Sequence, residues 1–187
     1  MSDLSKVWRQ EVLRFWFEEL EPKQWFQGSD ELDATITSRF KTILEEIRTW
    51  SVTSLVGQSA EDALAAVIVL DQFSRNIYRK QAEAFAQDML ARTVSSAAIE
   101  QELDQNLEEQ QRHFLYMPFM HAEDLDAQKR SLELFGALGD ENTLKFAREH
   151  YELVEQFGRF PYRNDVLGRQ SSPEEESYLK DGKRYGQ

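Results

Sequence analysis

Apolar residues recur at steps of three and four along almost the whole chain, and this spacing limits the fold more than any other feature. One such stripe runs from Leu4 to Trp16 and another from Leu32 to Ile47. This period lines one face of an α-helix, whereas a half-buried strand needs strict alternation. No segment shows sustained alternation, so the sequence predicts an all-α protein.

Several helix ends carry local signals. Ser59 and Asp62 have the spacing of a capping box, and the apolar stretch 63–70 continues to Ile77 at helical spacing, which predicts a mostly buried helix. Gly158 is a natural left-handed stop, and Ser172 begins a cap-proline-carboxylate pattern typical of a helix start. Further helices are predicted over Phe85–Ile99, around Phe114, over Asp124–Leu138, up to Gly158 and from Ser172.

Two segments are predicted to be loops, and one proline is predicted to interrupt a helix. Gln24–Phe26 should tuck its aromatic rings inward, and Val52–Val56 has the composition of a strand but no partner to pair with. Pro118 removes a backbone donor, so the helix around it must kink or stop there.

The expected architecture is seven to eight helices in antiparallel pairs, in one domain over residues 1–179 with a frayed tail at 180–187. A closed bundle and an open stack of helical hairpins both bury one stripe per helix, and periodicity does not choose between them.

Composition excludes several classes of protein. The chain of 187 residues has no cysteine, which excludes disulfides, iron–sulfur clusters and cysteine nucleophiles. A net charge of −12 works against binding to nucleic acid or to anionic membranes. The longest apolar run, residues 63–70, is far shorter than the roughly 20 residues of a membrane span. The acidic opening Met1-Ser2-Asp3 does not have the form of a signal peptide, so a cytoplasmic location is expected.

Standard catalytic spacings are missing from the sequence. It contains no phosphate-binding glycine loop, no nucleophile elbow and no His-Glu-x-x-His motif. His113 and His121 are two turns apart, roughly 12 Å on an unbroken helix, which is too far for one metal ion. We therefore predict neither a metal nor a cofactor.

Two groups of arginines stand among aromatic residues. Arg75 and Arg79 fall one helical turn apart, while Arg159 and Arg163 flank a proline that stiffens their loop. Both segments are locally positive within a strongly acidic chain. Guanidinium groups pair bidentately with carboxylate or phosphate, so these segments indicate an anion site. The candidate site residues are Arg75, Asn76, Tyr78, Arg79, His121, Arg159, Tyr162, Arg163 and Asn164.

Three other interpretations stay open. The arginines could instead be structural clamps that pair with Asp71, Asp165, or Glu123 and Asp124. His121 or His150 could act as a base oriented by Glu123 or Asp124, in a hydrolase or lyase. The chain could also be a homo-oligomeric scaffold that associates through an apolar face.

Five blocks of sequence resemble those of the bacterial domain-of-unknown-function 924 family. They are Val12–Phe17, Trp25–Phe26, Leu70–Arg79, Phe114–Asp124 and Phe157–Asn164. The resemblance implies an open α-α superhelix similar to tetratricopeptide-repeat proteins, and it implies no established activity. Tyr162 stands where the family often has histidine, and a phenol with a pKa near 10 cannot replace a neutral-pH base.

The leading hypothesis is a non-enzymatic module that accepts an acidic peptide or a small anion in an arginine- and aromatic-lined concave cleft. It requires the two arginine groups, far apart in sequence, to meet around a common hollow.

Overall fold

The computed structural model describes residues 4–182, which are largely helical with no strand among them, and the all-α prediction is confirmed. The α-helical elements are α1 (Leu4–Arg14), α2 (Asp30–Ile47), α3 (Val52–Val56), α4 (Ala60–Val67), α5 (Ser74–Ile77), α6 (Asp88–Glu100), α7 (Glu109–Met120), α8 (Leu125–Leu138), α9 (Glu141–Phe157) and α10 (Pro173–Asp181). The π-helical segments are η1 (Phe15–Glu19) and η3 (Ile68–Phe73), and the 3-10 turns are η2 (Pro22–Trp25), η4 (Ala82–Phe85), η5 (Leu103–Asn106) and η6 (Pro161–Arg163). Because η3 joins α4 to α5 without a break, these three form one continuous helix.

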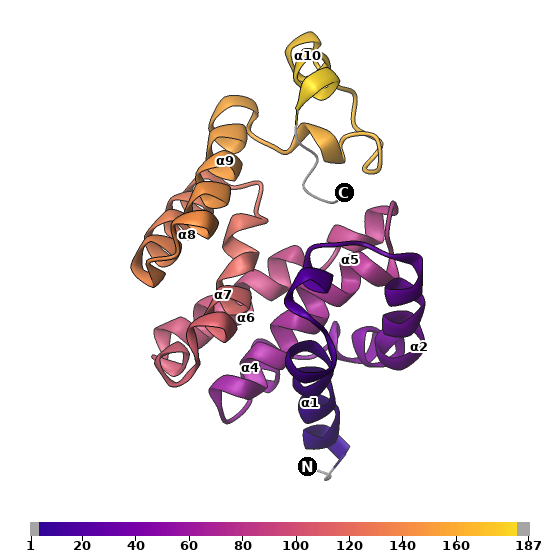
Figure 1. Cartoon of the computed structure of the whole chain (residues 1–187), viewed down its shortest axis with the longest axis vertical. Helices are drawn as coiled ribbons and strands as arrows, with labels where there is room; N and C mark the ends of the chain where they lie inside the picture. Colours follow the sequence, from indigo (N-terminus) through magenta and orange to yellow (C-terminus); the bar gives the residue numbers. More distant parts are fainter. Residues whose placement is uncertain (1–3, 183–187) are drawn as a thin grey trace.

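The helices follow one another in space much as they do along the chain. Figure 1 shows α1, α2 and α5 on one side, α8 and α9 on the other, and α6 and α7 between them. Only Gly139 and Asp140 separate α8 from α9, and the two helices pack against each other as an antiparallel pair. The short α10 lies at the opposite end of the molecule from α1 (Figure 1). A tetratricopeptide-like superhelix stays a prediction.

Aromatic rings fill the core where the first helices meet the central ones. The ring centroids of Phe40 and Phe73 are 4.6 Å apart, and Trp16 lies 5.5 Å from both Phe73 and Phe114. All four side chains are almost completely buried. The apolar stripes read from the sequence therefore face one another, and their burial supplies the main driving force for folding.

The predicted helix boundaries with side-chain caps are confirmed. The Ser59 hydroxyl accepts a hydrogen bond from the backbone N–H of Asp62 at 3.2 Å, at the start of α4. Gly158 ends α9 with a φ of 70°. Ser172 and Glu175 form a reciprocal capping box at the start of α10.

One loop prediction was wrong, and a second was only partly right. Val52–Val56 is the short helix α3, because Ser51 caps its first turn by accepting a bond from Ser54 N–H and two of its side chains are buried. Within Gln24–Phe26, Trp25 is half-buried and donates to the Trp16 carbonyl at 2.8 Å, as expected. Phe26, however, is 60% exposed and only stacks on Phe114 from outside.

Near Pro118, α7 continues for two residues and then ends at Met120. The helix thus ends within one turn of the proline, in keeping with the expected interruption. In the predicted C-terminal tail, α10 reaches Asp181, and residues 183–187 lie outside the described range. Among the described helices, none has the length and apolar character needed to traverse a bilayer.

Candidate functional site

A cleft of about 620 Å³ opens between the N-terminal loop 24–28, η3 and α5, the end of α7, and α9. Its volume lies within the range of small-molecule sites in proteins. Six of the nine predicted site residues line it: Arg75, Asn76, Arg79, His121, Tyr162 and Arg163. The two arginine groups identified from the sequence therefore meet in one hollow.

The contact between the two groups is a shared carboxylate on α6. Asp88 Oδ2 accepts from Arg75 Nη2 at 3.0 Å and from Arg163 Nη1 at 3.2 Å. The guanidinium of Arg163 also lies 4.4 Å from the Phe85 ring centroid and 4.6 Å from that of Phe160. Arg163 is thus held by one ion pair and two aromatic faces, with only 4% of its surface exposed.

Asp71 forms the second carboxylate of the site and is fully buried within the π-helical η3. Its Oδ1 lies 3.0 Å from Arg75 Nη1 and 2.8 Å from His121 Nδ1. Burial alone would raise the pKa of Asp71, but the charges of Arg75 and His121 outweigh it and hold that pKa well below its usual range. Asp71 is therefore ionised at neutral pH and orients the His121 ring through Nδ1.

All three histidines line the cleft. The rings of His121 and His150 are 6.4 Å apart, and His150 Nδ1 lies 2.8 Å from the Phe146 carbonyl. Burial lowers the pKa of His150 to about 3, and burial likewise lowers the pKa of His113. Within residues 4–182, no group of three or more histidine, aspartate or glutamate side chains is arranged to hold a metal ion.

The charged cluster is not fully hydrogen-bonded. Within the described part of the chain, three of its buried polar atoms have no hydrogen-bond partner: Arg75 Nε, Arg163 Nε and Asp88 Oδ1. Buried polar atoms in folded proteins are nearly always paired, so this cluster is an exception. Burial raises the pKa of the nearby Tyr162, which keeps its phenol neutral.

The other predicted residues have structural partners. Tyr78 donates to Glu45, Arg159 pairs with Glu175 at 2.7 Å, and the Asn164 amide donates to Ser171 at 3.0 Å. These three do not line the cleft. Arg79 and Asn76 do line it, but each also binds Asp33 Oδ1 at 2.8 Å.

The carboxylates expected to orient a histidine have other partners. Glu123 accepts from Arg169 at 2.6 and 2.9 Å and from the backbone N–H of Phe160. Asp124 caps α8 by accepting from Ala127 N–H at 2.7 Å. Asp71, 50 positions away in the chain, takes the place next to His121. The chain turns from α7 into α8 between His121 and Asp124, so neighbours in sequence diverge in space.

Sequence reasoning missed Asp88 and several apolar residues of the cleft. Asp88 is one of 34 acidic residues, and its position in the first turn of α6 gives it an ordinary structural role. Phe26, Phe85, Met117, Met120 and Phe146 also line the cleft. Helical periodicity assigns such residues to a core or a surface, and no periodic signal marks a cleft wall.

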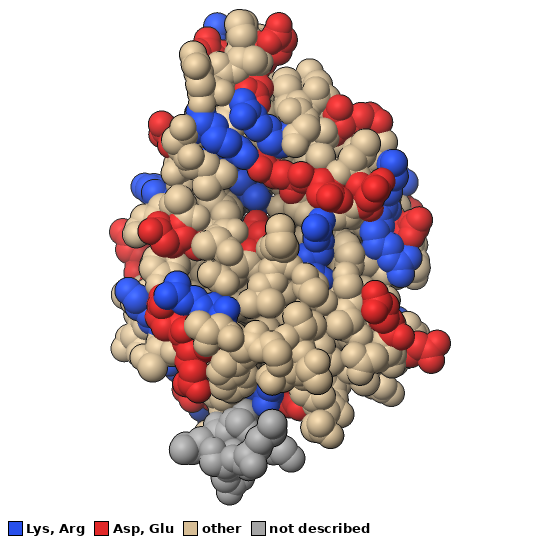
Figure 2. All heavy atoms as spheres, turned by 180° about the vertical axis from the view of Figure 1, so that it is seen from behind, with Lys and Arg blue, Asp and Glu red and all other residues tan. Residues whose placement is uncertain are grey.

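Charged side chains of both signs are mixed over the molecular surface. Figure 2 shows Lys and Arg side chains beside Asp and Glu over the face opposite to that of Figure 1. This mixture agrees with the many ion pairs of the described residues, such as Arg169 with Glu123 and Arg39 with Glu19. Most of these arginines therefore act as structural clamps. Arg75 and Arg163 differ from them because they share the carboxylate of Asp88.

The fold and the site together define an all-α protein with one arginine- and histidine-lined cleft of small-molecule size. The chain matches the model of a family of bacterial proteins of unknown function, domain of unknown function 924, over residues 12–183, and it belongs to that family. It is also similar to the solved structure of a protein of unknown function from Agrobacterium tumefaciens, with 36% sequence identity and a TM-score of 0.89. That match covers 95% of this chain and 99% of the other. No curated protein matches.

Proposed function

We propose that this protein binds a small anionic molecule in the cleft at Arg75, Arg163 and His121. The observation that carries the proposal is the sharing of Asp88 Oδ2 by two arginines at the cleft wall. Asp71 and Asp88 balance the charges of Arg75 and Arg163, but among the described residues the buried Nε atoms of both arginines have no hydrogen-bond partner. An incoming anion can therefore gain charge-assisted hydrogen bonds there. The buried position favours a small molecule over a peptide segment, because the charged groups lie inside the cleft rather than along an open face.

The clamp interpretation competes with this proposal and fits Arg159 better. Arg159 pairs with Glu175, and the hydrogen bond from Arg159 lowers the pKa of Glu175 to about 2. Arg159 lies outside the cleft. Arg159 therefore offers a control in which an equivalent ion pair is removed elsewhere.

The test compares Arg163→Gln with Arg159→Gln by thermal denaturation in the presence of a panel of carboxylates and phosphates. We expect at least one anion to raise the melting temperature of the wild type and of Arg159→Gln, and to leave Arg163→Gln unchanged. Arg163→Lys keeps the charge and should retain part of the effect. An equal response of Arg163→Gln and the wild type would refute the proposal.

A second candidate function is general-base catalysis by His121. The observation in its favour is the 2.8 Å contact between His121 Nδ1 and Asp71. This contact fixes the proton on Nδ1 and leaves Nε2 to accept a proton from a substrate or a water molecule. Turnover of esters or phosphoesters that His121→Gln abolishes would support catalysis. If the wild type binds an anion but turns over none of these esters and phosphoesters, the result would favour the binding module over catalysis.

A further inference from the structure

We propose that the anion is a monocarboxylate with an alkyl or aryl group, its carboxylate at Arg75, Arg163 and His121 and its apolar group between Phe26 and Phe146. This inference rests on the proposed function and adds the chemical class of the ligand. It follows from two features of the cleft, the charge at its inner end and the apolar side chains at its mouth.

The charges at the inner end of the cleft favour a monoanion over a dianion. Arg75 and Arg163 face the carboxylates of Asp71 and Asp88, so these four groups sum to zero. His121 lies beside Asp71, with its Nδ1 atom 2.8 Å from Asp71 Oδ1. A carboxylate adds one negative charge to this balanced cluster, whereas a phosphate dianion adds two, and uncompensated charge is costly in a buried place.

The neighbouring groups do not change this balance. Arg79 is paired with Asp33, and His150 is neutral because burial lowers its pKa to about 3. Lys80 and Asp140, which also line the cleft, carry opposite charges. The charge balance at the inner end therefore rests on the two arginines and the two carboxylates.

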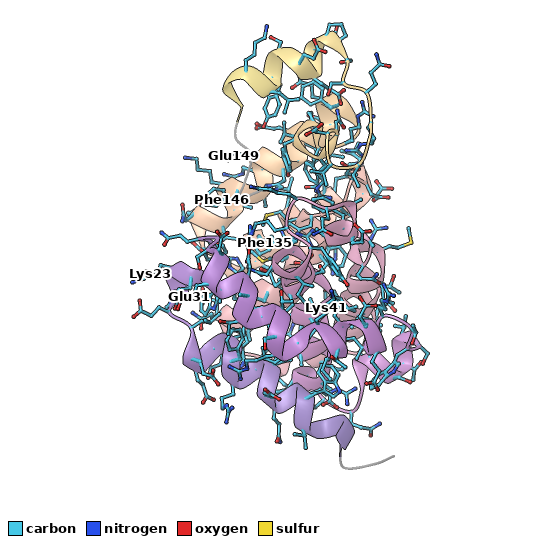
Figure 3. The ribbon with its side chains drawn as sticks, turned by 90° about the vertical axis from the view of Figure 1, so that its right-hand side faces the viewer. Lys23, Glu31, Lys41, Phe135, Phe146 and Glu149 are labelled. Atoms are coloured by element: carbon cyan, nitrogen blue, oxygen red, sulfur yellow. The ribbon has the colours of Figure 1, made fainter. Side chains whose placement is uncertain are left out.

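Two large aromatic side chains lie at the mouth of the cleft. Phe26 and Phe146 line the cleft and are 60% and 40% exposed, two of the few large apolar side chains on the described surface. Figure 3 shows Phe146 on α9 at the same edge of the view as Lys23 of η2, the turn that precedes Phe26. Exposed apolar side chains rimming a cleft are typical of a binding site.

The wall of the cleft also includes the sulfur-containing side chains of Met117 and Met120. These side chains are 7% and 3% exposed, and flexible thioethers adapt to varied apolar shapes. The lining therefore combines deeply buried charged groups with exposed aromatic rings. A ligand that matches this lining has a small ionised head that enters first and an apolar tail that follows.

The test measures dissociation constants by isothermal titration calorimetry for the straight-chain carboxylates from butanoate to octanoate. Octanol serves as the uncharged probe, and inorganic phosphate and phenyl phosphate serve as the dianions. We expect each added methylene to strengthen binding about fourfold. Octanol and the two phosphates should bind more weakly than octanoate.

Two variants locate the tail. Phe146→Ala should weaken octanoate binding about tenfold and leave butanoate nearly unchanged, because only the longer chain reaches the mouth. Met89→Ala is the matched control, since Met89 is 73% exposed on α6 and does not line the cleft. It should leave both affinities unchanged.

The outcomes separate this inference from the proposed function. Tighter binding of either phosphate at an Arg163-dependent site would overturn the monocarboxylate and keep the anion site. Equal affinities for butanoate and octanoate, or an unaffected Phe146→Ala, would overturn the placement of the tail. If octanol binds as tightly as octanoate, or no anion binds, both proposals fall.

Discussion

At the scale of single residues, Arg163 shows how a buried cation is held by one ion pair and two aromatic rings. It shares Asp88 with Arg75, and aromatic rings flank its guanidinium plane. Bringing a charge out of water is costly unless strong local contacts compensate. The rings supply part of this compensation, and unlike a second carboxylate they add no negative charge beside the guanidinium.

His150 gives a prediction about pH. Its pKa in the folded protein, about 3, is lower than its ordinary value of 6.5 because it is buried. As the pH falls, the unfolded chain therefore binds a proton at a higher pH than the folded protein does. The stability that neutral His150 contributes is fully present above pH 6.5 and is lost as the pH falls toward 3. Urea denaturation between pH 7.5 and 4.5 should show a fall of up to about 1.4 kcal/mol per pH unit from this residue.

The control for this prediction is His150→Gln, which does not titrate. Its free energy of unfolding should fall less steeply between pH 6.5 and 4.5 than that of the wild type. Identical slopes in the two proteins would show that His150 is already charged when folded.

At the scale of secondary-structure elements, most helix ends follow from local chemistry. Caps at Ser59 and Ser172 and the left-handed glycine at Gly158 act within one turn, so the sequence shows them directly. The π-helical η3 is different. It buries the adjacent side chains Asp71 and Gln72 together, which packing against α7 makes possible and periodicity does not reveal.

Two glycines of α8 give a paired prediction. Gly136 lies inside the helix and Gly139 follows it with a φ of 78°, and an added methyl group meets no atom within 4 Å at either position. Gly136→Ala should raise the free energy of unfolding by about 0.5–1 kcal/mol, because alanine favours the helix. Gly139→Ala should lower it by about 1–2 kcal/mol, because a left-handed conformation strains any β-carbon.

Chemical denaturation of both variants checks this prediction. Since neither methyl group makes contacts, the difference in sign comes from the backbone alone. Two changes of the same sign would contradict the assigned conformations.

At the scale of the whole molecule, ion pairs fasten the last segment to the rest. Arg169 holds Glu123, which lies between α7 and α8, and Arg159 holds Glu175 of α10. For these two arginines the clamp interpretation describes what the side chains do. An ion pair between arginine and a carboxylate thus holds two segments together at the surface, and in the cleft it is proposed to form part of a binding site. The burial and the neighbours of each pair decide between these roles.

The described surface gives a prediction about association. Its exposed large apolar side chains lie on separate elements, and two of them, Phe26 and Phe146, belong to the mouth of the cleft. A stable dimer needs a contiguous patch, so we expect a monomer of about 22 kDa at micromolar concentration. Sedimentation velocity checks this. A dimer that persists on dilution would instead support the scaffold interpretation.

The sequence by itself determined the helical class, most helix boundaries and the two arginine groups, because these depend on contacts within a few residues. It could not show that α3 is a helix, that Phe26 faces solvent, or that Asp71 rather than Glu123 lies beside His121. Tertiary structure alone brought Arg75 and Arg163 to Asp88. Such pairings depend on how distant helices pack, and a periodic pattern says which face of a helix is buried without saying against what.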